Sequence, residues 1–306
     1  MMRILKYCSR NLARSVYGGR RMTTRTSPTV RRRRLAREMR QLRRTTQRSR
    51  EDAAAYAGIA PATLSRIEAA THAPKPADIM ALCKFYGLDD DQTDALVTLA
   101  RQSRQRGWWH KYGDVLPKGF DVFVGLEEEA AELRSYQPEL ITGLLQTPEY
   151  MRALVLADLD VPDEVELERR ISVRIRRQEN LLCGDNPRQV WAIVHEGALR
   201  LQVGGPDVMR GQLEHLRDLS RRNCLTLQVL PFTAGAHPGM QTGFYLLGFA
   251  HPADPDIAYI EYRTGGVFLE QPDEVRVYEK IFDQLRARAA GPDDARKLID
   301  QILIEM

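Results

Sequence analysis

The sequence has few features that would commit it to a redox, metal-dependent or membrane role. Its 306 residues include only four cysteines, Cys8, Cys83, Cys183 and Cys224. None forms a C-x-x-C pair or has histidines at zinc-finger spacing, so we expect reduced thiols, no disulfide framework and no metal site. No apolar run approaches the roughly 20 residues that a membrane helix requires. We therefore predict a cytoplasmic protein without a membrane span.

Signatures of catalysis are also missing. His195-Glu196 has no second histidine four residues on, and the chain has no G-x-S-x-G, Walker loop or G-x-G-x-x-G. We predict no catalytic residue and no cofactor. His237 lies in a glycine-rich loop, 235–240 (GAHPGM), which we interpret as a turn that needs glycine for its backbone angles. The alternative is a surface that meets a ligand or partner.

Charge is concentrated at one end of the chain. Residues 1–50 hold 17 of the 45 basic residues and a single acid, Glu38, which gives +16. Residues 51–306 hold 28 basic and 40 acidic residues, which gives −12. Concentrated arginine neutralises phosphates and releases counterions, so this region favours nucleic acid over the alternative of a solvated basic tail. Phosphate contacts are predicted for Arg31, Arg32, Arg33 and Arg34.

Segment 49–68, SREDAAAYAGIAPATLSRIE, has the pattern of a helix-turn-helix, a motif that places a helix in a DNA groove. Ser49 is a good N-cap for the first helix, and Gly58 suits the left-handed turn that ends it. Pro61 opens the second helix, where its missing N–H costs nothing. On that helix Leu64 and Ile67 face inward. The opposite, exposed side carries Ala62, Thr63 and Arg66.

Turn-forming segments and hydrophobic periodicity divide the chain into four parts. Residues 1–30 form a basic leader expected to be disordered, with Met22 as the expected true start; an organellar transit peptide is the alternative. Five short helices are predicted between 31 and 105, the first over 31–44. Residues 106–122 form a linker in which Trp108 and Trp109 are predicted to fill the seam between two domains, a recognition surface being the alternative. Residues 123–306 form the second domain.

Helical and strand patterns alternate in that second domain. In 224–230, CLTLQVL, the residues Leu225, Leu227 and Val229 alternate with polar ones, as in a half-buried strand. Helices are predicted over 123–135, 148–157, 163–182, 206–222, 272–289 and 292–304, and strands over 190–195, 224–231, 243–250 and 257–263. The fold class is therefore an all-helical five-helix domain followed by an α+β domain with a small mixed sheet.

Several blocks give the chain a family resemblance. Residues 35–105, with GIAPATLSRIE at 58–68, resemble the Xre (Cro/C1-type) repressor DNA-binding domain. Residues 106–117 (RGWWHKYGDVLP), 136–150 (YQPELITGLLQTPEY) and 229–240 (VLPFTAGAHPGM) resemble actinobacterial WhiJ-like, antitoxin-like regulators. In these, an Xre domain precedes a domain without assigned chemistry. The resemblance covers nearly all of 35–304.

The resemblance implies roles for individual residues. The base contacts of the family fall on Pro61, Ala62 and Arg66. Its phosphate contacts fall on Arg50, where the family usually has glutamine, and on Thr63. We also expect Arg43 and Glu68 to pair across the domain, although a surface role for either is as consistent with the sequence. Gln47-Arg48 departs from the usual Gly-Leu, which leaves the loop before Ser49 less defined.

Three functions remain open from the sequence. The first is a sequence-specific regulator that binds double-stranded DNA as a homodimer, associates with the nucleoid and uses its second domain as a non-catalytic interaction module. The resemblance implies that this module docks a small acidic protein encoded nearby. The second is an enzyme with a fused DNA-binding head, which would need a polar pocket with perturbed acids or histidines. The third is a non-specific nucleoid-type DNA binder that uses the basic arm alone.

Overall fold

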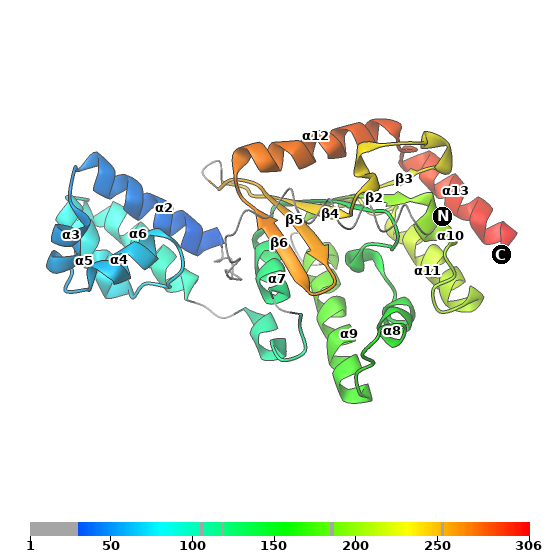
Figure 1. Ribbon diagram of the computed structural model, residues 1–306, viewed down its shortest axis with the longest axis horizontal. Coiled ribbons are helices and arrows are strands. Elements are labelled where there is room, and N and C mark those ends of the chain that lie inside the picture. Colours follow the sequence, from blue (N-terminus) through cyan, green and yellow to red (C-terminus); the bar gives the residue numbers. More distant parts are fainter. Residues whose placement is uncertain (1–29, 105–106, 118, 184–186, 252–253) are drawn as a thin grey trace, which may run out of the picture.

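The computed structural model describes residues 30–104, 107–117, 119–183, 187–251 and 254–306. Residues 30–104 form the five predicted helices, which pack together as a separate body beside the rest of the chain (Figure 1). They are α2 (Val30–Thr45), α3 (Arg50–Tyr56), α4 (Pro61–Glu68), α5 (Pro76–Tyr86) and α6 (Asp90–Ser103). We call residues 30–104 the head. The predicted leader, including Met22, lies outside the described residues apart from Val30.

The head follows the local signals in its sequence. The Ser49 side chain accepts a hydrogen bond from the Asp52 backbone N–H and so caps α3. Gly58 has a φ of 66°, and Pro61 is the first residue of α4. The core between the helices is apolar and fully buried, and it includes Leu35, Met39, Ala53, Ala54, Leu64, Ile67, Ile79 and Leu82.

The linker packs against the second domain. A 3-10 helix, η1 (Trp108–Tyr112), precedes α7 (Phe120–Glu129). Trp109 is 8% exposed, and a Cβ placed on Gly125 of α7 would lie 2.9 Å from its ring. Trp108 donates from its indole Nε1 to Glu128 at 3.2 Å. Both indoles therefore anchor the linker to the first helix of the second domain.

A mixed sheet forms the centre of the second domain. Its order is β3-β2-β1-β4-β5-β6. The strands are β1 (Glu132–Gln137), β2 (Gln189–His195), β3 (Leu225–Leu230), β4 (Phe244–Gly248), β5 (Ile257–Tyr262) and β6 (Gly265–Leu269). β1, β2 and β3 run parallel, whereas the β1–β4, β4–β5 and β5–β6 pairs are antiparallel. The carboxyl ends of β1, β2 and β3 consequently meet at one edge.

Helices cover both faces of the sheet. Along one face runs α12 (Pro272–Arg288), whose Phe282 and Leu285 pack with Tyr136 and Phe244 (Figure 1). The opposite face is covered mainly by α7, α11 (Pro206–Leu219) and α13 (Pro292–Glu305), which share a second apolar cluster. α8 (Pro148–Leu156) and α9 (Glu164–Gln178) form a small cluster of their own beside it. Among the described residues, every helix is too short or too polar to cross a lipid bilayer.

The helix predicted over 123–135 is wrong in its second half. α7 ends at Glu129, and 132–137 is β1, a central strand paired with β2 and β4. Its residues Glu132, Leu133 and Arg134 favour helices, but Leu133 and Tyr136 are buried on opposite faces of the sheet, and this tertiary burial overrides propensity. The short helix α10 (Glu196–Arg200) and strand β6 were not predicted. The other predicted elements match to within a few residues.

Candidate nucleic-acid interface

The outward face of α4 carries the residues predicted to read bases. Pro61, Ala62 and Arg66 are exposed and Thr63 is half-buried, whereas Leu64 and Ile67 are buried in the head core. The Arg66 guanidinium lies along its own helix, with Nη2 3.3 Å from the Thr63 hydroxyl and Nε 3.4 Å from the Ala62 carbonyl oxygen. Both contacts are long. Arg66 can therefore swing outward to a base edge at little cost.

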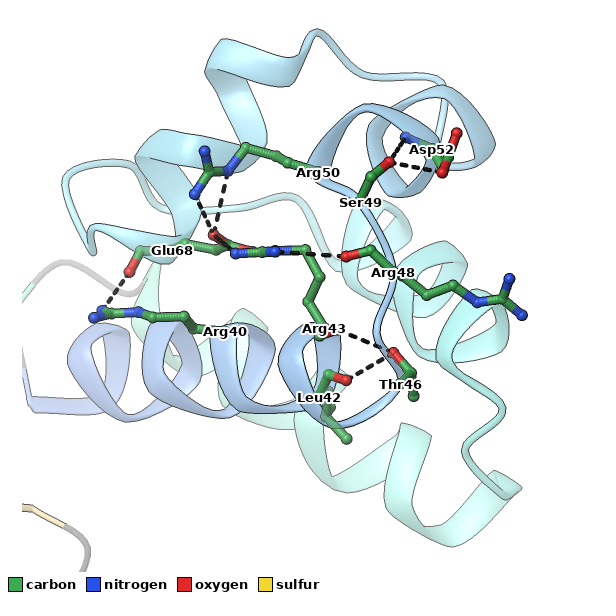
Figure 2. A network of polar contacts seen from close by, with 9 residues as sticks. All are labelled: Arg40, Leu42, Arg43, Thr46, Arg48, Ser49, Arg50, Asp52 and Glu68. Carbon is green, nitrogen blue, oxygen red and sulfur yellow. Dashed lines mark hydrogen bonds and ion pairs between the residues drawn. The ribbon is translucent and has the colours of Figure 1, made fainter.

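The C-terminal end of α4 is held by three arginines that bond to Glu68 (Figure 2). Arg43 donates to both carboxylate oxygens, from Nε at 2.6 Å and from Nη2 at 3.1 Å. Arg50 Nη2 donates to Oε2 at 3.1 Å. Arg40 Nη2 donates to the backbone carbonyl of Glu68 at 2.7 Å. These bonds tie α2, α3 and α4 together and fix the direction in which the recognition face points. The ion pair expected between Arg43 and Glu68 is present.

Glu68 stays ionised because of these partners. The residue is 3% exposed, and burial alone would favour its neutral form. The hydrogen bonds from Arg43 and Arg50 outweigh that burial and hold the pKa of Glu68 below its ordinary value. The ionised carboxylate of Glu68 therefore holds α4 against α2 and α3 at neutral pH.

Arg50 is the first residue of α3 and was predicted to contact a phosphate. Its side chain is 40% exposed, while its guanidinium is bonded to Glu68. The side chain is therefore partly open to solvent while it holds Glu68. Phosphate contact by Arg50 stays a prediction.

Three of the four arginines at the start of α2 turn toward the second domain. Arg31 lies 4.0 Å from Glu129, Arg33 lies 3.2 Å from Glu270, and Arg34 Nη2 lies 2.7 Å from His251 Nε2. Arg32 donates to the carbonyl of Ser103 within the head at 3.4 Å. The structure thus gives these four side chains protein partners. Their predicted phosphate contacts would require those partners to be exchanged.

Other arginines near α4 were not singled out from the sequence. Arg44 and Arg48 are exposed, and Arg40 is exposed while it bonds to the end of α4. The Arg48 guanidinium lies 5.1 Å from the centre of the Phe85 ring. The spacing of Arg40 and Arg44, four apart and off the Leu35–Met39–Leu42 face, is the signal that could have identified an exposed basic stripe on α2.

Comparison with known families assigns both parts of the chain. A helix-turn-helix domain model matches residues 34–96, which contain α3 and α4. A second model, described as a domain of unknown function (DUF5753), matches residues 120–301, more than half of the chain. The chain belongs to the DUF5753 family. A search of curated proteins found no match, and a search of solved structures found none either.

The two family models agree with the architecture. The helix-turn-helix match supports DNA binding by the head. The DUF5753 match begins at Phe120, the first residue of α7, so that domain contains the whole sheet. It brings no assigned chemistry with it, and the role of the sheet domain has to be argued from its own residues.

Proposed function

We propose that this chain is a sequence-specific transcriptional regulator of the Xre (Cro/C1) type, WhiJ-like and antitoxin-like as in actinobacteria, acting on the nucleoid in the cytoplasm. The observation that carries the proposal is the geometry of α4. Its outer face presents Pro61, Ala62 and Arg66, while its C-terminal end is fixed by the arginines on Glu68. A rigid helix with small residues near its start can lie close to base edges in the major groove.

Replacement of Arg66 tests this proposal. Arg66→Ala should weaken binding to the preferred site by about 1–3 kcal/mol and relax the preference at one base pair, because one bidentate contact to guanine O6 and N7 is lost. The measurement is a binding-site selection followed by affinity titration. Arg44→Ala is the matched control: Arg44 is exposed on α2, and its loss should weaken all sequences alike. A uniform loss with Arg66→Ala would contradict base readout.

We propose further that the protein acts as a homodimer. A single recognition helix reads too few base pairs for useful specificity, and two copies would read half-sites about 10 bp, or a multiple of it, apart. Light scattering at micromolar concentration and footprinting on the selected site measure both features. A monomer that protects a single half-site would contradict the dimer.

The DUF5753 domain is proposed to sense a ligand or to dock a partner, such as a small acidic protein, without catalysis. Its contacts with α2 give it a direct route to the head. Arg33 and Arg37 of α2 pair with Glu270 and Asp254 at 3.2 and 3.0 Å. Beside these pairs lies a cleft of about 1010 Å³, walled by α2, the linker, β6 and the start of α12. Binding that separates these charges would free the head, which couples the two domains.

A further inference from the structure

Two histidines singled out in the sequence, 42 residues apart, meet at the carboxyl edge of the parallel strands. His195 is the last residue of β2, and His237 lies in the loop that follows β3. Their ring centres are 6.0 Å apart. In sheets with parallel strands, the crevice outside the carboxyl ends is where ligands bind, because the loops from neighbouring strands converge there.

Tyr136 of β1 lies beside His237. Its ring centre is 5.9 Å from that of His237, in an edge-to-face arrangement. The loop is pressed onto this tyrosine, since a Cβ on Gly239 would lie 2.7 Å from the ring. Gly239 thus lets the loop approach closely enough to hold His237 over Tyr136. The three rings come from three separate segments that only the fold brings together.

The cluster holds polar atoms that the protein itself does not satisfy. Tyr136 is completely buried, and its hydroxyl has no hydrogen-bond partner among the described residues. The buried Nδ1 of His237 likewise lacks a partner within that part of the chain. Buried polar atoms without partners are costly, and such groups in native proteins point to a ligand or water at the site.

The donors in the cluster are defined. His195 Nδ1 accepts a hydrogen bond from the Gly197 backbone N–H at 3.1 Å, so the neutral ring carries its proton on Nε2 and can donate there. Burial raises the pKa of Tyr136 to about 12, so its hydroxyl keeps its proton and can also donate. Arg288 is held next to His237 by a 2.7 Å bond from Nη1 to the carbonyl of Ala236.

The electrostatic surroundings favour an anion over a cation. Burial first, and then the neighbouring His195 and Arg288, lower the pKa of His237. The nearest buried carboxylate, Glu196, is already engaged by the Phe232 backbone N–H at 2.9 Å and by Arg200 at 2.8 Å. The cluster therefore offers hydrogen-bond donors in a positive field, which suits an oxyanion and disfavours a metal ion.

We propose that the DUF5753 domain binds a small oxyanion, the phosphate or carboxylate group of a ligand, between His195, His237, Tyr136 and Arg288. This proposal names the class of ligand for the sensor role proposed above. It depends on that role only for the regulatory effect of binding, not for binding itself. The anion accepts hydrogen bonds from the two imidazoles and the hydroxyl, and the guanidinium of Arg288 balances its charge.

The test uses the full chain without DNA, so that its failure is distinct from a failure of DNA binding. Histidine ring resonances are followed by NMR while inorganic phosphate, or acetate in a parallel arm, is added at constant ionic strength. The His195 and His237 resonances should shift saturably with at least one anion. The pKa of His237 should rise in the complex, because a bound anion favours the protonated imidazole. The anion with the lower saturating concentration identifies the group.

Two variants sharpen the result. His237→Ala should abolish the saturable shift of His195. Tyr136→Phe removes only the unpartnered hydroxyl and should reduce affinity about tenfold without loss of folding, the worth of one hydrogen bond to a charged group. His72→Ala, in the head, is the control and should bind as the parent does. No saturation with either anion, or equal saturation in all the variants, would overturn the proposal.

Discussion

Each domain buries a glutamate against arginine, and the two sites differ in how far the arginine is exposed to solvent. Glu127 of α7 accepts two hydrogen bonds from Arg177 of α9, at 2.7 and 2.8 Å, with side chains 1% and 4% exposed. The Arg177 guanidinium also lies over the Phe120 and Phe123 rings. Glu68 in the head is equally buried, but its partner Arg50 is 40% exposed.

This difference in exposure separates a purely structural pair, Glu127–Arg177, from a pair that extends to the DNA-binding face, Glu68–Arg50. The Glu127–Arg177 pair joins α7 to α9, and its burial keeps a DNA phosphate from reaching it. Arg50, in contrast, is 40% exposed while it bonds to Glu68, the last residue of the recognition helix (Figure 2). The same chemistry thus locks a core in one domain and positions a binding face in the other.

Breaking the buried Glu127–Arg177 pair should have the largest effect on stability. Glu127→Ala leaves the Arg177 charge buried without its partner, and we expect a loss of about 3–5 kcal/mol in the free energy of unfolding of the second domain. Chemical denaturation measures this. The double variant Glu127→Leu with Arg177→Met removes both charges and should recover most of the loss. A single-variant cost as small as that of a surface pair would show that the pair is open to water.

Breaking the partly exposed contacts of Glu68 should lower the free energy of unfolding by less, but should weaken DNA binding. Glu68→Gln removes the charge that Arg43 and Arg50 share, and we expect the head to lose about 1.5–3 kcal/mol, the range for hydrogen bonds to charged groups. Specific DNA affinity should fall with it, because α4 loses its anchor. Glu51→Gln, an exposed acid in the first turn of α3, is the control. Equal effects of the two variants would contradict the anchoring role of Glu68.

Acid should act oppositely on the buried carboxylate of Glu68 and the half-buried carboxylate of Glu129. The pKa of Glu68 is lowered because its arginine bonds outweigh burial, so its stabilisation is present above the unfolded value of 4.5 and is lost as the pH falls below it. The pKa of Glu129 is raised, chiefly by burial, despite Arg31. Its protonated form is therefore favoured by folding, and that contribution disappears as the pH rises. Carboxyl NMR titrations should place Glu68 below 4.5 and Glu129 above it; the reverse order would refute both assignments.

The same contrast explains what the sequence could predict. The head was predictable because its signals are local: Ser49, Gly58 and Pro61 mark caps and a turn whatever packs around them. The Arg43–Glu68 pair was one of two interpretations that the sequence allowed, and the packing of α2 against α4 decides between them. The convergence of Arg40 and Arg50 on the same residue depends on how three helices pack, which no local pattern records.

In the second domain the missing information is tertiary. β1 has helix-favouring residues and becomes a strand only because β2 and β4 flank it. β6 begins with Gly265-Gly266, which weakens any strand pattern, and it lies at the edge of the sheet beside β5. His195 and His237 look unrelated in the sequence because they follow different strands. Only the parallel pairing of β2 with β3 brings both loops to one edge.

The smallest expected effect concerns the contact between the two domains. Arg33 of α2 lies 3.2 Å from Glu270, with side chains 14% and 37% exposed, so the pair is worth about 0.2–1 kcal/mol. Glu270→Gln should free Arg33 for phosphate and raise affinity for non-specific DNA by about two- to fivefold at low salt, the gain fading as salt rises. Asp300→Asn on α13 removes the same unit of charge from the pair with Arg217, far from the head, and is the matched control. Electrophoretic or fluorescence titration measures both. If the two variants raise affinity equally, net charge alone is responsible, and the acids that hold α2 do not compete with DNA for its arginines.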